Sequence, residues 1–277
     1  MNPAAPAPAP AAPVAWLEFI LPLREPAEGL GQTVAALLGQ TERGFTVRLC
    51  PAPGNRPRQA AATAAAALQQ AGIPVPSTPA PAGLSPLELY NWAHDQGRAE
   101  WLKPLLSGDE LHPDYVARLA GPAASPTAQV VWCGYHAGAA TIHRPGTGRP
   151  PLAGRLAPAE FLRTLEAGAR WLGGPANLAY RRTAWRALGG VPPALPAEGV
   201  RLLAAELALH FGLELLPETL ATHAVPSTEP AAGRANATAE SRLVLRSLQN
   251  WCRTAKLEWP AAGLAWTEGW NVPRRLV

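Results

Sequence analysis

The sequence has little lysine, cysteine or methionine, and it has no long hydrophobic run. Lysine occurs only at Lys103 and Lys256, so nearly all of the 24 basic side chains are arginines. The net charge of +4 and the pI near 9.3 are spread over 277 residues without a cluster of basic side chains. This distribution argues against nucleic-acid binding, which needs a concentrated basic surface. No apolar run approaches the roughly 20 residues that cross a bilayer, so we expect no transmembrane segment.

Several common sites are also missing. The three cysteines, Cys50, Cys133 and Cys252, are odd in number and far apart, which excludes a disulfide framework and a CxxC metal site. There is no GxxxxGK[ST] loop, GxGxxG, HExxH or GxSxG motif. Residues 1–14 alternate alanine and proline without the apolar core of a secretory signal, and predict an extended, disordered tail. A reducing, cytoplasmic location is the expectation.

What is present is an alternation of short apolar runs with helical periodicity. We expect strands at 16–23, 45–50, 101–105 and 129–135, with helices at 29–38, 58–71, 86–96 and from Pro113. Such alternation predicts an α/β fold with a mostly parallel sheet flanked by helices. Ligands bind such sheets beyond the carboxyl ends of the strands, which directs attention to loops 22–28, 51–57 and 106–112.

The second half is less regular. We expect a long loop at 136–158, helices at 158–168, 183–188, 198–211 and 241–256, and strands at 177–181 and 219–223. The domain is expected to cover 15–228, followed by a C-terminal helical extension and tryptophan-rich tail at 229–277. Three roles are open for the tail tryptophans, which could pack back onto the domain, line an acceptor groove or meet a partner; they are Trp251, Trp259, Trp266 and Trp270.

The order of several segments carries a resemblance. Residues 91–115 read NWAHDQGRAEWLKPLLSGDELHPDY, which resembles the central region of family 2 glycosyltransferases: an Asn, a short helix, GEW(I/L)K, an acidic metal loop and LxPDY. Other stretches resemble further motifs of this family in the same order, namely 20–22, 31–41, 173–177, 181–182, 188–190 and 215–220. The resemblance covers about residues 16–228.

The resemblance implies a GT-A fold, a nucleotide-sugar donor, a glycan or lipid-linked acceptor, and a divalent Mg²⁺ or Mn²⁺ ion. A lipid-linked acceptor would bring the protein to the periphery of a membrane. In such enzymes the metal neutralises the diphosphate leaving group, and a carboxylate deprotonates the acceptor hydroxyl. By position, the nucleotide-binding candidates are Leu23, Arg24, Glu25, Asn55 and Asn91.

The acidic positions of the family are altered in this chain. The loop after the second strand has Pro51 and Ala52 in place of an acidic pair, so Asn55 or Arg56 either binds the nucleotide or belongs to a solvated turn. The metal loop has Gly108 in place of the metal-binding Asp. Asp109 follows it, and this residue either takes the metal after a shift of one residue or caps a turn.

The acceptor base is altered in the same way. The family's acidic pair before the late helix reads Glu198-Gly199, where Glu198 is either the catalytic base or an acid favoured by the helix dipole. Val225 replaces the family's late histidine, but His223 lies two residues earlier, on the same face of a strand, and is a candidate substitute. If no metal is used, cations must stabilise the diphosphate, and the candidates by position are Arg24, Arg56, Arg181 and Arg182.

Two hypotheses follow. In the first, the chain is a glycosyltransferase that uses Asp109 for the metal, and Glu198 and His223 for catalysis. In the second, the chain is a pseudo-glycosyltransferase that has kept the fold as a binding or scaffold protein. The sequence does not specify the sugar, the acceptor or the oligomeric state.

Overall fold

The computed structural model describes residues 15–25, 27–137, 141–143, 153–161, 175–191 and 199–223. Several predictions fall outside these residues. They concern the tail at 1–14, the extension at 229–277, most of the helix at 158–168, and Glu198.

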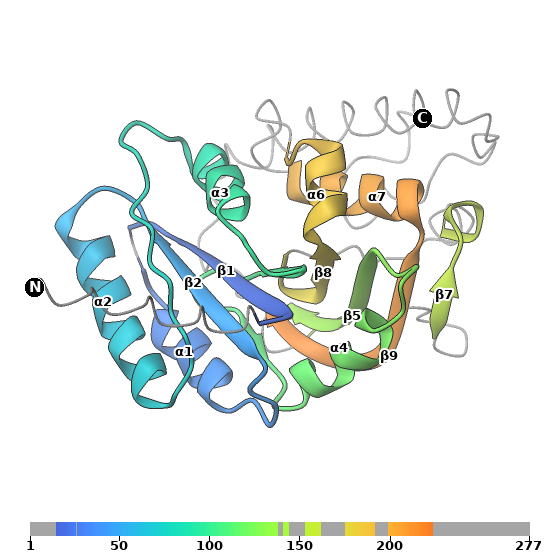
Figure 1. Ribbon diagram of the computed structural model, residues 1–277, viewed down its shortest axis with the longest axis horizontal. Coiled ribbons are helices and arrows are strands. Elements are labelled where there is room, and N and C mark those ends of the chain that lie inside the picture. The colour runs from blue at the N-terminus through green and yellow to red at the C-terminus, as the bar shows by residue number, and fades with distance from the viewer. Residues whose placement is uncertain are drawn as a thin grey trace, which may run out of the picture.

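In the described residues, nine strands form one sheet with the order β2-β1-β3-β8-β5-β9-β4, with β6 paired to β5 and β7 paired to β9 (Figure 1). The strands are β1 (Leu17–Leu23), β2 (Phe45–Pro51), β3 (Trp101–Pro104), β4 (Glu110–Leu111), β5 (Val130–Ala137), β6 (Thr141–His143), β7 (Gly154–Leu156), β8 (Leu178–Arg181) and β9 (Leu213–His223).

The sheet is mostly parallel, as the sequence predicts. The three longest ladders, β1 with β2, β1 with β3 and β5 with β9, are all parallel. Strand β8 is antiparallel to both β3 and β5, so β3 and β5 run in the same direction. The carboxyl ends of β1, β2, β3, β5 and β9 therefore lie along one edge, which we call the carboxyl edge, while the opposite side is the amino edge.

Helices cover both faces of the sheet and enclose two cores (Figure 1). One face packs against helices α1 (Leu30–Leu38), α2 (Asn55–Gln70) and α4 (Tyr115–Ala123). The other packs against α3 (Pro86–Asp95), α6 (Arg182–Leu188) and α7 (Gly199–Phe211). A short 3₁₀ turn, η1 (Pro175–Asn177), precedes β8. The fold is therefore a mixed α/β sandwich of helices around a central sheet.

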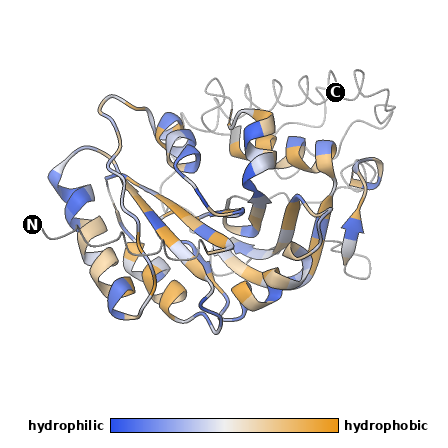
Figure 2. Ribbon diagram, viewed as in Figure 1, coloured by the Kyte–Doolittle hydropathy of each residue, from blue (hydrophilic) through white to orange (hydrophobic). Residues whose placement is uncertain are grey.

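The central strands are buried on both faces, which explains their nearly continuous apolar sequences. Leu17, Phe19 and Leu21 of β1 point into the core with α1 and α2, whereas Ile20 points into the other core. This alternation follows from the two-residue period of a strand. Strands β1 and β2 are accordingly largely orange in Figure 2.

Helix α3 begins with the capping box that its sequence predicts. The Glu88 backbone N–H donates to Ser85 Oγ at 3.3 Å, and the Ser85 N–H donates to Glu88 Oε2 at 2.8 Å. Pro86 occupies the first turn, where its missing N–H is not needed.

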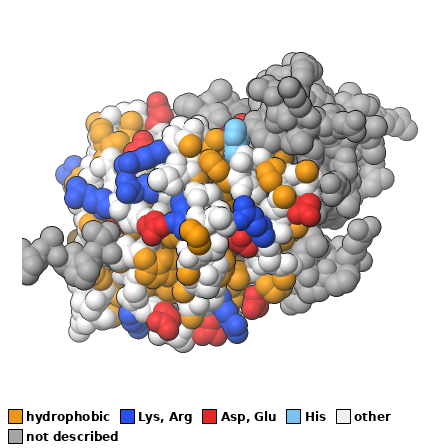
Figure 3. All heavy atoms as spheres, turned by 45° about the vertical axis from the view of Figure 1, so that its right-hand side comes forward, with side chains coloured by type: hydrophobic (Ala, Val, Ile, Leu, Met, Phe, Trp, Pro, Cys, Tyr) orange, Lys and Arg blue, Asp and Glu red, His pale blue; other side chains and the backbone are white. Residues whose placement is uncertain are grey.

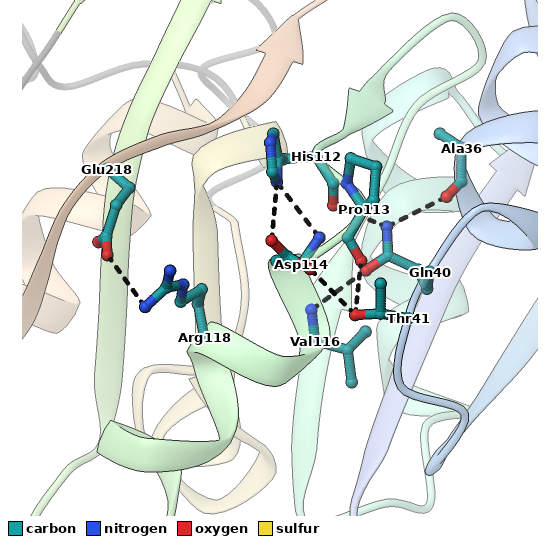
Figure 4. A network of polar contacts seen from close by, with 9 residues as sticks. All are labelled: Ala36, Gln40, Thr41, His112, Pro113, Asp114, Val116, Arg118 and Glu218. Carbon is teal, nitrogen blue, oxygen red and sulfur yellow. Dashed lines mark hydrogen bonds and ion pairs between the residues drawn. The ribbon is translucent and has the colours of Figure 1, made fainter.

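Two segments that resemble family motifs are joined by one buried side chain. Gln40, at the end of α1, donates from Nε2 to the carbonyls of Ala36 and His112, and its Oε1 accepts from the Val116 N–H at 3.1 Å (Figure 4). Thr41 Oγ1 adds contacts to the Pro113 carbonyl and to Asp114. The end of α1 is thereby fixed to the start of α4.

The second half differs from the sequence prediction. The expected loop at 136–158 contains β6 and β7, each of three residues, which are too short to show a period in the sequence. Strand β9 begins at Leu213 rather than at residue 219, since it pairs with β5 through two register shifts around Gly134. Helix α2 begins at Asn55 rather than at Arg58, so Asn55 and Arg56 lie in its first turn.

The composition raises two questions for the structure, namely whether a helix could span a membrane and how the charged side chains are distributed. None of the helices in the described part is long and apolar enough to cross a membrane. On the face drawn in Figure 3, groups of Lys and Arg side chains are interrupted by Asp and Glu.

Candidate functional site at the carboxyl edge

The ends of β1 and β2 bring together most of the predicted nucleotide-binding residues. Leu23 pairs with Pro51 at the last position of this parallel ladder, and the Ala52 N–H donates to the Leu23 carbonyl at 2.7 Å. Leu23 is fully buried, so its backbone and not its side chain faces the edge. Arg24 and Glu25 follow it and are exposed.

A hollow of about 340 Å³ lies at these strand ends, lined by Glu25, Ala27, Arg56 and Pro57. Gly54 closes the turn before α2 with a φ of 130°, and a Cβ there would lie 3.8 Å from Glu25 Oε1. Asn55 is exposed at the first position of α2. The hollow offers one carboxylate and one guanidinium, a pair suited to polar groups of a nucleotide.

The loop after β3 rests on α1. The Gly108 N–H donates to Thr33 Oγ1 at 2.9 Å, and Thr33 Oγ1 lies 3.3 Å from the Leu106 carbonyl. Gly29 and Gly108 have φ values of 80° and 95°, in the region that favours glycine. A Cβ on Gly29 would lie 2.6 Å from the Gly108 Cα, so the two backbones touch.

Asp109 and His223 meet at this edge. Strand β4 pairs with β9 through Glu110 and Thr222, and this antiparallel register continued by one residue places Asp109 opposite His223. Asp109 Oδ1 lies 2.9 Å from His223 Nδ1, and Asp109 Oδ2 accepts from the Leu106 N–H at 2.8 Å. The Asp109 side chain is fully buried, and the His223 side chain is 23% exposed. Asp109 thus both caps its own turn and faces the histidine.

The donor set at this point limits how a metal could be held. Among the described residues, no group of three or more His, Cys, Asp or Glu side chains could hold an ion. The 2.9 Å separation of Asp109 Oδ1 and His223 Nδ1 is that of a hydrogen bond, which an ion bound by these two atoms would have to replace. Mg²⁺ is often held by one or two carboxylates together with substrate phosphates. Since the described residues offer one carboxylate and one histidine at this point, an ion there would need phosphate oxygens as further ligands.

Sequence reasoning missed a buried cation below this site. Lys103, in β3, is fully buried, and its Nζ donates to the carbonyls of Pro104 at 2.9 Å and Ala176 at 2.7 Å. It also lies 5.4 Å from the centroid of the Tyr115 ring. Burial lowers the pKa of Lys103 to about 8, opposed by nearby Cys133 and Asp109. The available signal was a lysine within a buried strand of an arginine-rich chain.

Three other candidates do not join this group. The side-chain amide of Asn91 is bonded to the backbone of Val191, with Nδ2 donating to its carbonyl at 2.7 Å and Oδ1 accepting its N–H at 2.9 Å.

Arg181 and Arg182 lie at the amino edge, because β8 is antiparallel and Arg181 pairs with Trp101, the first residue of β3. The prediction that these two arginines serve the diphosphate is therefore wrong. Glu198 immediately precedes the described part of α7.

Known protein-family models and curated proteins give no match to this chain. Solved structures do. S. aureus TarS 1–349 in complex with UDP superposes with a TM-score of 0.61 and 13% identity, over 84% of this chain and 65% of that one. The fold is glycosyltransferase-like. The mannosyltransferase PcManGT from Pyrobaculum calidifontis, in complex with GDP-Man and Mn²⁺, superposes with a TM-score of 0.59 and 16% identity.

The superpositions extend over most of this chain but over smaller shares of the neighbours. The superposition on the mannosyltransferase includes 97% of this chain and 72% of the mannosyltransferase. The chain spans 65% of the TarS fragment and 39% of the longer TarS structure. At identities this low the likeness establishes the fold, and the residues at the carboxyl edge must carry any argument about activity.

Proposed function

We propose that this chain binds a nucleotide-sugar at the carboxyl edge and transfers the sugar to a glycan or lipid-linked acceptor. The observation that carries the proposal is the contact between Asp109 and His223, 2.9 Å apart at the edge where the hollow beside Glu25 and Arg56 opens. In open α/β sheets this edge is where ligands bind.

Apart from Asn91, each predicted site residue has a stated role in this proposal. The Leu23 backbone, Arg24, Glu25 and Asn55 bind the nucleoside and its phosphates. Asp109 and His223 would hold a Mg²⁺ or Mn²⁺ ion together with the diphosphate, with the ion replacing the hydrogen bond between them. When bound, the ion neutralises the charge that develops on the leaving group. Arg24 and Arg56 add positive charge on the solvent side, and Glu198 accepts the proton of the acceptor hydroxyl.

A thermal titration tests donor binding. The melting temperature is measured with UDP, GDP and dTDP, each with and without Mn²⁺. A ligand at 100 times its dissociation constant adds about 2.7 kcal/mol, or roughly 5–10 °C for a domain of this size. We expect one nucleotide to give such a shift, larger with Mn²⁺. No shift with any of the three would refute donor binding.

Two variants assign the metal-dependent part. Asp109→Asn keeps an oxygen for the Leu106 N–H but removes the charge, so the additional shift caused by Mn²⁺ should disappear. Glu42→Gln, at an exposed position after α1, is the control and should behave as the parent. A Mn²⁺ effect that persists in Asp109→Asn would remove Asp109 from the site.

Binding without turnover is the second candidate. It is favoured by the Asp109 carboxylate, which is fully buried and bonded through both oxygens, and by Gly108 in place of an acid. Release of nucleoside diphosphate from UDP- and GDP-sugars separates the two functions. A nucleotide-dependent thermal shift without any release, even with added glycan acceptors, would support the binding role.

A further inference from the structure

A second hollow lies at the amino edge of the sheet. This amino-edge cavity, of about 460 Å³, is lined by Trp16, Arg98, Glu100, Arg181, Arg182 and Thr183, with Ala15 at its rim. Trp16 precedes β1, and Arg24 of the candidate donor site follows it. The seven residues of β1 span about 23 Å, so the two sites are far apart.

One arginine of the cavity is a fixed part of its wall. Arg181 donates from Nε to the Ala128 carbonyl and from Nη2 to the carbonyls of Ala123 and Ser125. Its guanidinium pairs with Glu100 and lies 5.0 Å from the centroid of the Trp101 ring. The side chain is 12% exposed. Arg181 and Glu100 therefore neutralise each other.

The other two arginines are not neutralised in this way. Arg182 donates from Nε to the Ala99 carbonyl at 3.1 Å. Its two terminal guanidinium nitrogens make no hydrogen bond within the described residues and can donate to a ligand. The backbone of Arg98 is held by Glu18, whose Oε2 accepts the Arg98 N–H at 2.6 Å. In the described part of the chain, ion pairs form with Arg48, Arg118 and Arg181, but not with Arg98 or Arg182.

We infer that the amino-edge cavity binds a small phosphate monoester, with Arg98 and Arg182 as its phosphate ligands. Two uncompensated guanidinium groups match the charge of a phosphate dianion, and arginine binds phosphate through parallel hydrogen bonds. The half-buried indole of Trp16 supplies an apolar face for the remainder of the molecule. The volume suits a ligand of the size of a sugar phosphate.

Calorimetric titration of the full chain tests this inference, with glucose 6-phosphate as the probe and glucose as its neutral counterpart. We expect glucose 6-phosphate to bind and glucose not to bind. The double variant Arg98→Gln/Arg182→Gln should weaken binding at least tenfold. Arg186→Gln is the matched control, because Arg186 is exposed on α6, the helix that carries Arg182, and does not line the cavity.

Each outcome decides the question. Absence of glucose 6-phosphate binding, or equal binding by the double variant, would overturn the inference. The Arg98 side chain makes no hydrogen bond within the described residues. Arg98→Gln alone therefore serves if the double variant is poorly folded, and it should weaken binding at least threefold.

The cavity is also distinguished from the donor site. Saturating UDP with Mn²⁺ should leave the titration of glucose 6-phosphate unchanged, as should Asp109→Asn. Displacement by UDP would place the phosphate at the carboxyl edge instead. A failure of the proposed donor site is therefore distinguishable from a failure of this cavity.

Discussion

At the scale of single residues, Gly29 and Gly108 allow the start of α1 to contact the loop after β3. Gly108 has a φ of 95°, and its backbone touches Gly29 at the start of α1. A side chain at position 108 would have to adopt a conformation that costs an L-residue about 1–2 kcal/mol. A side chain at position 108 is therefore disfavoured, and the acid that follows it, Asp109, points toward β9.

Gly29→Ala should destabilise the protein strongly, because the new Cβ would lie 2.6 Å from the Gly108 Cα and neither backbone can easily move. We expect a loss of about 2–4 kcal/mol in the free energy of unfolding, from the positive φ and the overlap together. Gly31→Ala is the control in the same helix, where a Cβ meets nothing within 4 Å. It should stabilise the protein by about 0.5–1 kcal/mol. Urea denaturation of both variants measures the difference, and equal stabilities would contradict the predicted contact.

The sequence could indicate some of these residues but not their contacts. Asp109 and His223 were each candidates from position alone, and 114 residues separate them in the chain. Their contact depends on the pairing of β4 with β9, and two residues of β4 carry no detectable period. Of the two alternative roles for Asp109, the cap is present, since Oδ2 accepts the Leu106 N–H, while the role as a metal ligand stays a prediction.

At the scale of elements, the segments that resemble family motifs are contact points between elements. Gln40 follows α1 and bonds to the His112 carbonyl before α4 and to the Val116 N–H within it (Figure 4). Asn91 of α3 bonds to Val191 after α6, and Lys103 of β3 bonds to η1. Each of these side chains bonds to backbone groups of another element and so fixes the two elements together.

Gln40→Ala should cost about 3 kcal/mol in unfolding free energy. The substitution leaves the His112 carbonyl and the Val116 N–H without their partner, and each buried polar group left unpaired costs about 1–3 kcal/mol. Thr41→Ala is the neighbouring control, because Thr41 is exposed and its lost contacts can be replaced by water. We expect its cost to stay below about 1 kcal/mol. Chemical denaturation compares the two, and a larger loss for Thr41→Ala would refute the proposed role of Gln40.

The elements of the first half could be predicted because their strands are buried on both faces and their helices carry caps or apolar stripes. Strand β1 and helix α3 lie within one residue of their expected bounds. In the second half, β8 lies within one residue of its expected bounds, but β6 and β7 could not be predicted, because they depend on pairing with distant strands. The position of Arg181 at the amino edge also follows from strand direction, which sequence periodicity does not contain.

At the scale of the whole molecule, both cores share one sheet, so a group buried deep in either core can affect the entire unfolding transition. His94 of α3 is such a group. It is fully buried, and its ring centroid lies 4.1 Å from that of Tyr90 and 4.8 Å from that of Trp185. Its Nδ1 lies 2.7 Å from the Tyr90 carbonyl, which requires the proton on Nδ1. Burial, with a smaller effect from Lys103, lowers the pKa of His94 to about 3.

This shift predicts sensitivity to acid. Because the pKa of His94 is lower in the folded protein than the 6.5 of the free side chain, the unfolded chain binds an additional proton between these values. The stability that depends on neutral His94 is therefore complete above pH 6.5 and is lost as the pH falls toward 3. The full loss corresponds to about 5 kcal/mol.

His94→Phe should remove this dependence, since phenylalanine fills the aromatic cluster without binding a proton. At pH 7 the variant should be less stable than the parent by about 1 kcal/mol, for the lost bond to the Tyr90 carbonyl. The difference should diminish and reverse as the pH falls from 6.5 toward 3, because only the parent loses the contribution of neutral His94. Unfolding free energies measured by urea at successive pH values give the two curves. His112→Gln, at a histidine whose side chain is 52% exposed, should run parallel to the parent throughout. Parallel curves for His94→Phe and the parent would show that His94 titrates normally in the folded protein.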